Sequence, residues 1–177
     1  MLTLSKSEIL AIFRREIGLD PRRTDCSITV REGLDVDDIL LRHIRRWYLN
    51  LLDSAPPELL PTGDVASKSG LTLRPDSPWG SVALPQEARR PLRIKLKGWV
   101  NDAAVTSPDK AAASVSRMAS PFGKPGNYEP LAVAEGHTIL VCPPSGIVES
   151  LTAIIDPGED TYILDESLLP SGHILNF

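Results

Sequence analysis

The hydrophobic positions of this chain follow one period in its first third and another in its second half. Up to about residue 55 they recur every three to four residues, and beyond about residue 80 they alternate with polar residues. Side chains on one face of a helix repeat about every 3.6 residues, and those on one face of a strand repeat every two. The pattern therefore predicts a helical front and a strand-rich back.

The first predicted helix covers about 6–17 and begins with a capping box. Ser5 and Glu8 have the spacing at which each side chain bonds the other residue's backbone N–H, and apolar residues at helical spacing follow them. Gly18 suits the left-handed conformation that ends many helices. The next segment, 21–31, fits either a short helix after Asp20-Pro21 or an extended strand, and both remain open.

The longest predicted helix follows Gly33. Asp35 is the predicted N-cap, and Asp37 and Asp38 lie in the first turn, where the helix dipole favours anions. Pro56-Pro57 ends it, because proline disfavours the α conformation of the residue before it. The apolar positions of this helix form one stripe: Val36, Ile39, Leu40, Ile44, Trp47, Tyr48, Leu51 and Leu52. The opposite side carries Arg42, Arg45, Arg46 and Asn50.

The second half predicts several strands. The clearest is 92–99, in which Leu92, Ile94 and Leu96 face one way and Arg93, Lys95 and Lys97 the other. A hairpin is predicted around Glu135-Gly136. The remaining predicted elements are short strands at 81–85, 148–155 and 162–164, a short helix near 108–119 that begins at Ser107-Pro108, and helical turns at 63–69 and 165–169.

These elements predict an α+β fold, with N-terminal helices (a capped helix and a long amphipathic helix) followed by a small antiparallel β module with one short helix. We expect a helical region at 1–62, a linker at 63–80, where Pro, Gly, Ser, Thr and Asp predominate, and a β-rich module at 81–177.

Composition narrows the class of protein. The net charge is −4, so a protein that coats nucleic acid by neutralising phosphates is not expected. The 16 prolines are nearly twice the usual share of about 5%, which favours short segments and stiff loops. Cys26 and Cys142 form no metal-binding pattern, and we expect reduced thiols. We also expect no signal peptide and no membrane span.

Motifs for chemistry are weak throughout. Ser107 and Lys110 match the S-x-x-K pattern of serine acyl-enzymes, and Lys68-Ser69-Gly70 resembles its K-T-G partner but precedes it. A helix start explains the first match equally well. Gly123-Lys124 lacks the other residues of a phosphate-binding loop. Asp35, Asp37 and Asp38 lack the later ligands of a calcium loop, and His43, His137 and His173 are scattered. We predict no catalytic, cofactor-binding or metal-binding residues.

Two sets of cations have two interpretations each. Arg93, Lys95 and Lys97 form either a solvated strand face or a contact surface for an acidic partner or passing nucleic acid. Arg42, Arg45 and Arg46 allow the same two interpretations, and a solvated helix face is the one we favour. The tryptophans, Trp47, Trp79 and Trp99, are expected in the core or at an interface.

The order of elements resembles the tail-tubular or head-to-tail adaptor proteins of short-tailed bacteriophages. The resemblance covers about 34–157 and is carried by Leu84-Pro85 before the strand at 92–99, and by the hydrophobic run 139–142 that leads into Pro143-Pro144. Such adaptors usually end in a sizeable helix, whereas 156–177 is short and contains Pro157 and Pro170.

The resemblance implies a structural virion protein in the neck or tail, assembled in the cytoplasm of a bacterial host. It would be a non-enzymatic subunit of a connector ring below the portal. Its partners would be copies of itself, the portal and tail proteins, with transient contact to passing DNA, and it would need no cofactor. The alternatives are a non-viral accessory domain that binds proteins and a hydrolase of unrecognised family.

Overall fold

The computed structural model describes residues 1–18, 36–73, 77–118 and 123–170 of the chain. The chain forms two compact units: unit 1 comprises Met1–Pro61 and Asp156–Phe177, and unit 2 comprises Thr62–Ile155. Unit 2 is thus inserted between two parts of unit 1. The predictions made for 21–31, Cys26, Asp35 and His173 lie outside the described residues.

Unit 1 contains both helices predicted for the front of the chain. Helix α1 (Lys6–Glu16) begins with the predicted capping box, in which Ser5 and Glu8 bond each other's backbone N–H. Helix α2 (Val36–Ser54) packs on α1, and Phe13 and Trp47 meet edge to face with ring centroids 5.0 Å apart. Six apolar side chains of the two helices are buried: Ile9, Phe13, Leu40, Ile44, Tyr48 and Leu52.

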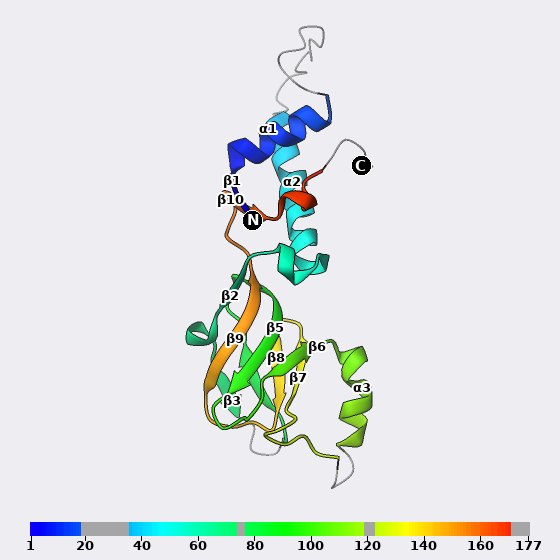
Figure 1. The fold of residues 1–177 in the computed structure, drawn as a ribbon, viewed down its shortest axis with the longest axis vertical. Coiled ribbons are helices and arrows are strands. Elements are labelled where there is room, and N and C mark those ends of the chain that lie inside the picture. Colours follow the sequence, from blue (N-terminus) through cyan, green and yellow to red (C-terminus); the bar gives the residue numbers. More distant parts are fainter. Residues whose placement is uncertain (19–35, 74–76, 119–122, 171–177) are drawn as a thin grey trace. The chain divides into compact units, whose positions relative to one another are not determined.

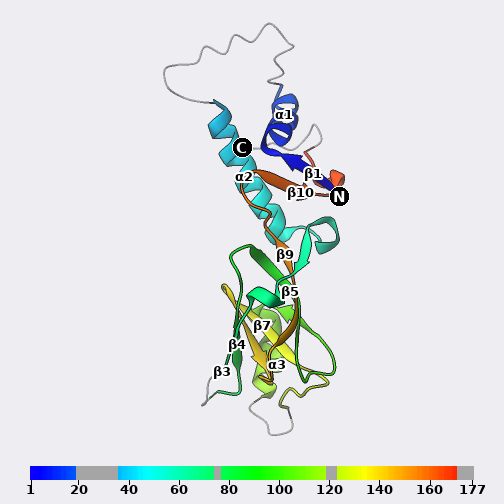
Figure 2. The same cartoon turned by 90° about the vertical axis from the view of Figure 1, so that its left-hand side faces the viewer.

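Unit 1 also contains a small sheet that joins the two ends of the chain. Strand β1 (Leu2–Ser5) pairs antiparallel with β10 (Thr161–Leu164), with Leu2 opposite Leu164 (Figure 1 and Figure 2). Two 3₁₀ turns, η1 (Pro57–Leu59) and η3 (Glu166–Leu168), are tied together because the Asp165 N–H donates to the Leu59 carbonyl at 3.0 Å.

Unit 2 is built on a curled sheet of eight strands in the order β2-β9-β5-β6-β7-β8-β4-β3 (Figure 1). The strands are β2 (Thr62–Asp64), β3 (Leu71–Leu73), β4 (Gly80–Ala83), β5 (Ala88–Leu96), β6 (Ala103–Thr106), β7 (Leu131–Glu135), β8 (Thr138–Cys142) and β9 (Val148–Ile155). A 3₁₀ turn, η2 (Ala66–Lys68), follows β2. β6 and β7 are parallel, and all other neighbouring pairs are antiparallel.

The apolar core of unit 2 comes from alternate positions of these strands. In β5, Ile94 and Leu96 are fully buried, whereas Arg93 is exposed and Lys95 is half-buried, so the predicted alternation is confirmed. Val82, Ile139, Val141 and Leu151 join the same cluster from β4, β8 and β9. The core is therefore made by strands that are close in space but spread over some 70 positions of the chain.

Helix α3 (Pro108–Arg117) connects β6 to its parallel neighbour β7, and it contacts β7. A parallel pair needs such a crossover, because a tight turn can join only antiparallel strands. The predicted hairpin is present as β7 and β8, but its two turn residues are Gly136 and His137, one position later than the predicted Glu135-Gly136. Gly136 has a φ of 60°, which glycine adopts without strain.

The predicted fold class is wrong. The chain does not consist of N-terminal helices followed by a small antiparallel module; it is mostly a curled, mixed eight-stranded sheet, with a second, two-stranded antiparallel sheet and three α-helices among the described residues. The interval 63–80, expected as a linker, contributes β3 and most of β2 to the large sheet. Strands of three or four residues are too short to show a two-residue period, which is why the sequence did not reveal them.

Candidate assembly surfaces

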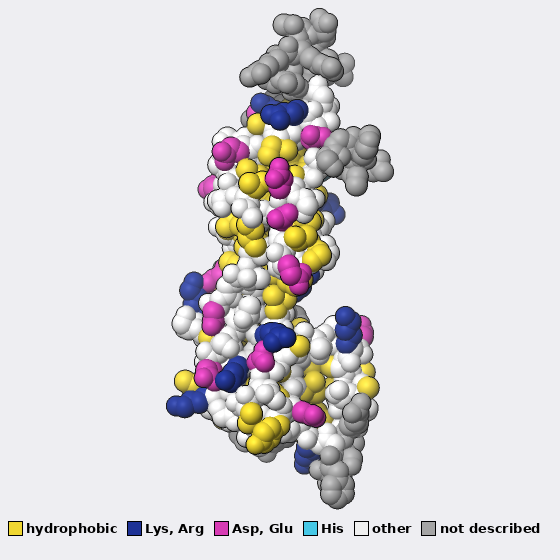
Figure 3. Space-filling model, in the orientation of Figure 1, with side chains coloured by type: hydrophobic (Ala, Val, Ile, Leu, Met, Phe, Trp, Pro, Cys, Tyr) yellow, Lys and Arg dark blue, Asp and Glu magenta, His cyan; other side chains and the backbone are white. Residues whose placement is uncertain are grey.

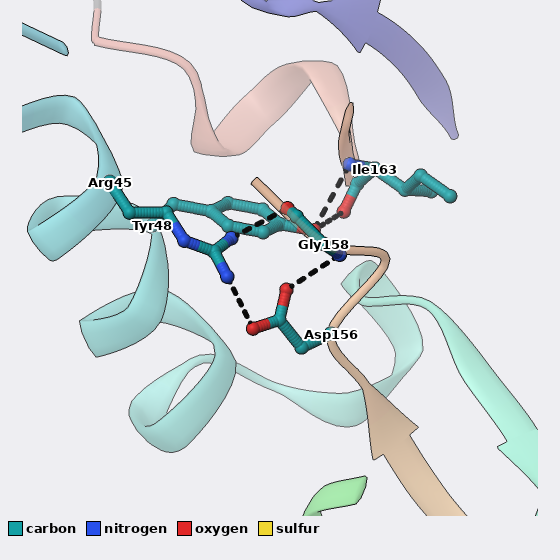
Figure 4. Close-up of polar contacts among 5 residues, drawn as sticks. All are labelled: Arg45, Tyr48, Asp156, Gly158 and Ile163. Atoms are coloured by element: carbon teal, nitrogen blue, oxygen red, sulfur yellow. Dashed lines mark hydrogen bonds and ion pairs between the residues drawn. The ribbon is translucent and has the colours of Figure 1, made fainter. Parts of the chain in front are cut away.

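A polar anchor holds α2 against the returning end of the chain in unit 1 (Figure 4). The Arg45 guanidinium donates to the Asp156 carboxylate at 2.5 Å and to the Gly158 carbonyl at 2.9 Å. Its Cζ lies 5.9 Å from the centre of the Tyr48 ring. Arg45, predicted on a solvated helix face together with Arg42 and Arg46, is instead a half-buried structural residue.

Tyr48 forms the second part of this anchor. Its hydroxyl donates to the Ile163 carbonyl at 2.9 Å and accepts from the Ile163 N–H at 3.0 Å. Its ring meets that of Tyr162 edge to face at 5.0 Å. Burial raises the pKa of Tyr48, more than the hydrogen bond to Ile163 lowers it, so the hydroxyl keeps its proton and remains a donor.

A groove of about 490 Å³ lies beside this anchor, between α2, the start of α1 and residues 159–162. Its cations are Lys6, Arg42, Arg45 and Arg46, and its carboxylates are Asp38 and Glu159. Arg45 is already engaged by Asp156, whereas Lys6, Arg42 and Arg46 form no ion pair within the described ranges. The groove therefore offers three cations to a ligand or partner, beside two carboxylates.

An acidic edge lies elsewhere on unit 1, at η1 and η3. It consists of Glu58, Asp165 and Glu166, and Figure 3 shows Asp and Glu side chains exposed over these turns. The Ser167 hydroxyl and N–H donate to Asp165 at 2.7 and 3.0 Å, and these bonds lower the pKa of Asp165. Glu58 and Glu166 form no ion pair within the part of the chain that the structure describes.

The cation ladder of β5 is largely neutralised by carboxylates from β9 and from the loop before β6. Arg93 pairs with Asp102 at 2.8 Å, and Lys95 pairs with Glu149 at 3.4 Å. Lys97 is exposed and has no ion pair among the described residues. Two of its three cations are thus paired within unit 2. This favours the first of the two interpretations, a solvated strand face, over a contact surface for an acidic partner.

Loops 97–102 and 143–147 are bound together at one end of unit 2. The Lys97 N–H donates to the Ile147 carbonyl at 2.8 Å, and the Trp99 Nε1–H donates to the Pro143 carbonyl at 3.0 Å. Gly146 has a φ of 59°, and a Cβ atom there would lie 2.6 Å from the Lys97 carbonyl oxygen. The close approach of the two loops therefore requires glycine at this position.

A third loop, 123–130, joins the same end. The Val100 N–H donates to the Asn127 carbonyl at 2.8 Å, and the Asn101 side-chain amide donates to the Tyr128 carbonyl at 2.7 Å. Loop 97–102 is thus hydrogen-bonded to both of the other loops and connects them.

These braced loops expose large apolar side chains. Val100, Tyr128 and Ile147 are 53%, 72% and 65% exposed, and we call them the loop end of unit 2. Figure 3 shows hydrophobic side chains at the end of unit 2 that carries these loops. Apolar groups held rigidly in water at one place are typical of protein contact sites, because their burial releases water at no further cost in loop ordering.

The residues that matched catalytic motifs lie at a helix start, in an ion pair and in an exposed loop. Ser107 occupies the N-cap position of α3, and Lys110 is exposed on that helix. Lys68 pairs with Glu87 at 2.5 Å. Lys124 is exposed in the loop at 123–130, where its charge acts on Cys142, although burial dominates and raises the pKa of that thiol.

The histidines and tryptophans are equally dispersed. His43 is exposed on α2, and His137 is exposed in the turn between β7 and β8. Trp99 is buried in the core of unit 2, as predicted, while Trp47 packs in unit 1. Within residues 1–18, 36–73, 77–118 and 123–170, no three metal-ligating side chains converge, and no helix combines the length and apolarity needed to cross a membrane.

Neither the groove nor the loop end was found from the sequence. The groove combines Lys6 with α2 and residues near 160, and the loop end combines three loops spread over some 50 positions. The signal for the groove was the set of arginines on α2.

Comparison with protein-family models finds no match for this chain, and comparison with curated proteins finds none either.

Proposed function

We propose that this chain is a non-catalytic structural protein of a phage or prophage particle, a subunit of a head-to-tail connector ring below the portal. The observation that carries the proposal is the loop end of unit 2. Val100, Tyr128 and Ile147 are exposed on loops fixed by five hydrogen bonds, an arrangement suited to docking against another protein.

The resemblance to phage adaptors bears on the same part of the molecule. Its second motif, the hydrophobic run into Pro143-Pro144, is strand β8 followed by the loop that carries Ile147. Its first motif, Leu84-Pro85, directly precedes the long central strand β5. The strand at 92–99 and the run into Pro143-Pro144 thus lead into two of the three braced loops, whereas Leu84-Pro85 lies outside them.

The test is assembly of the full chain. Sedimentation velocity and negative-stain imaging should show a ring-like oligomer, either of the chain alone or in a mixture with a phage portal protein. The variant Val100→Asp with Ile147→Asp should lose this assembly, because burying an unpaired carboxylate in an apolar contact is strongly unfavourable. The proposal would be refuted by a chain that stays monomeric at every concentration and never binds the portal or another neck protein.

The matched control is Val115→Asp on α3. Val115 is also an exposed apolar residue, 40% accessible, but it does not belong to the loop end. The control should assemble like the unmodified chain. Equal loss of assembly in Val115→Asp would mean that the added charge itself, and not the loop end, prevents assembly.

A further inference from the structure

The groove of unit 1 presents cations that the unit itself does not neutralise. Arg42 and Arg46 are exposed one helical turn apart on α2, and Lys6 lies in the same groove at the start of α1. Arg45, which lies between Arg42 and Arg46 on α2, is bonded to Asp156 and Gly158. These bonds hold this side of the groove in place. The cations are therefore already in place on a folded helix, and a partner that binds here loses no free energy in ordering that helix.

The occupant that fits these cations is a protein surface with carboxylates rather than a nucleic acid. Asp38 and Glu159 also line the groove, and they would repel a continuous phosphate backbone. The apolar lining, from Leu41, Leu49 and Tyr162, suits aliphatic side chains beside the carboxylates. The chain as a whole is acidic, with a net charge of −4.

The acidic edge of unit 1 combines carboxylates with aliphatic side chains, as such a partner surface would. Glu58 and Glu166 are exposed without an ion pair in the described part of the chain, and Leu168 and Leu169 lie half-buried beside them. The bond from Asp165 to Leu59 holds η1 and η3 in one piece. None of these residues lines the groove, so one copy can offer the edge while its own groove receives another.

We propose that the groove at Lys6, Arg42 and Arg46 receives the acidic edge, Glu58, Asp165 and Glu166, of a second copy of this chain. Such a contact joins two different surfaces, and repeating it produces a closed ring when the rotation between copies closes. The inference rests on the proposed ring function and names the copy-to-copy contact within it.

Charge reversal with complementation tests the contact. The groove variant is Arg42→Glu with Arg46→Glu, and the edge variant is Glu58→Lys with Glu166→Lys; circular dichroism first confirms that both fold. In sedimentation velocity, each variant alone should self-associate at least about tenfold more weakly than the unmodified chain, because like charges then face each other. An equimolar mixture should regain a 1:1 complex, since one variant's reversed groove matches the other's reversed edge.

The control carries the same charge change away from the contact. Arg15→Glu with Lys110→Glu reverses two exposed cations, one on α1 and one on α3, that form no ion pair in the described ranges, and it should associate normally. Association of the unmodified chain should also weaken as salt rises, since screening reduces contacts between exposed charges.

Several outcomes overturn the inference. Normal association of either reversed variant, failure of the mixture to recover, or equal loss in the control would each do so. Loss of binding to a DNA oligonucleotide in the groove variant, with unchanged self-association, would assign the groove to nucleic acid instead. A monomeric chain that still binds the portal refutes the copy-to-copy contact but leaves the proposed function standing.

Discussion

The two units of this protein are held together in different ways. In unit 2, eight strands enclose an apolar core to which seven of those strands or their adjoining loops contribute, so no single contact dominates. In unit 1, the helices have an apolar core, but the returning segment is tied to α2 by Arg45 and Tyr48, which bond residues 111 to 115 positions away. Unit 2 is therefore held by apolar contacts spread over its strands, whereas unit 1 adds to its apolar core a few polar bonds between residues far apart in the chain.

The polar bonds of both units also matter for assembly. Both proposed contacts lie on parts that these bonds hold in place: the groove beside the Arg45 anchor and the loop end on three loops tied to one another. Preformed surfaces lose less conformational entropy when they bind. The polar bonds of each unit thus also prepare its contact surface.

The largest effect is expected from opening the core of unit 2. Leu151 is fully buried in the middle of β9, and Leu151→Ala should cost about 2–5 kcal/mol through lost burial and the cavity left behind. Denaturant unfolding followed by fluorescence would measure it, in two backgrounds that keep only Trp99 or only Trp47. If unit 1 unfolds independently, Trp47 should report an unchanged transition; a matching shift of both signals would show that the two units unfold together.

Removing the Tyr48 hydroxyl tests the polar bonds between α2 and the returning segment of unit 1. Tyr48→Phe leaves both the N–H and the carbonyl of Ile163 without their partner and should cost about 2–4 kcal/mol. Tyr162→Phe is the matched control, because that hydroxyl forms no hydrogen bond within the described residues. Thermal unfolding of the two variants, followed at Trp47, compares them, and equal losses would contradict the role given to the Tyr48 hydroxyl.

Glycine substitutions separate the loop end from an ordinary turn. Gly146 and Gly136 have almost the same φ, 59° and 60°, but only at Gly146 would a Cβ meet another loop, whereas nothing lies within 4 Å of the one at Gly136. Gly146→Ala should therefore cost about 1–2 kcal/mol more than Gly136→Ala, as expected for overpacking. The difference in denaturant midpoint measures it, and equal midpoints would mean that the two loops are not locked together.

The smallest effect is expected on the strand ladder. Arg93→Gln breaks an exposed ion pair with Asp102 and should change the stability of unit 2 by less than about 1 kcal/mol. Lys97→Gln, which breaks no pair within the described ranges, serves as the reference in the same unfolding experiment. A loss well above that of the reference would place this pair among the structural contacts and weaken the contrast between the two units.

Local elements were predictable where their determinants lie close together in the sequence. The capping box of Ser5 and Glu8, the stripe of α2, the alternation in β5 and the hairpin of β7 and β8 all depend on spacings of two to four residues. Each is present in the structure, because adjacent side chains alone favour that backbone conformation.

The overall architecture was not predictable in this way. The parallel pairing of β6 with β7, the pairing of β1 with β10 and the short strands β2 and β3 depend on contacts between distant segments. A three-residue strand has too few positions to show a period, and its conformation is set by the neighbour that it hydrogen-bonds. The fold class was accordingly predicted wrongly although many of its elements were predicted correctly.

The candidate surfaces show the same division. The amino-acid sequence alone determined that Arg42, Arg45 and Arg46 share one side of a helix, because helical spacing requires it. Only the folded chain decided that Arg45 is bound by Asp156 while Arg42 and Arg46 remain exposed, and that the loops carrying Val100, Tyr128 and Ile147 lie at one end of unit 2. Spacing decides which side chains share a face, whereas the pairing of distant segments decides which of them are covered.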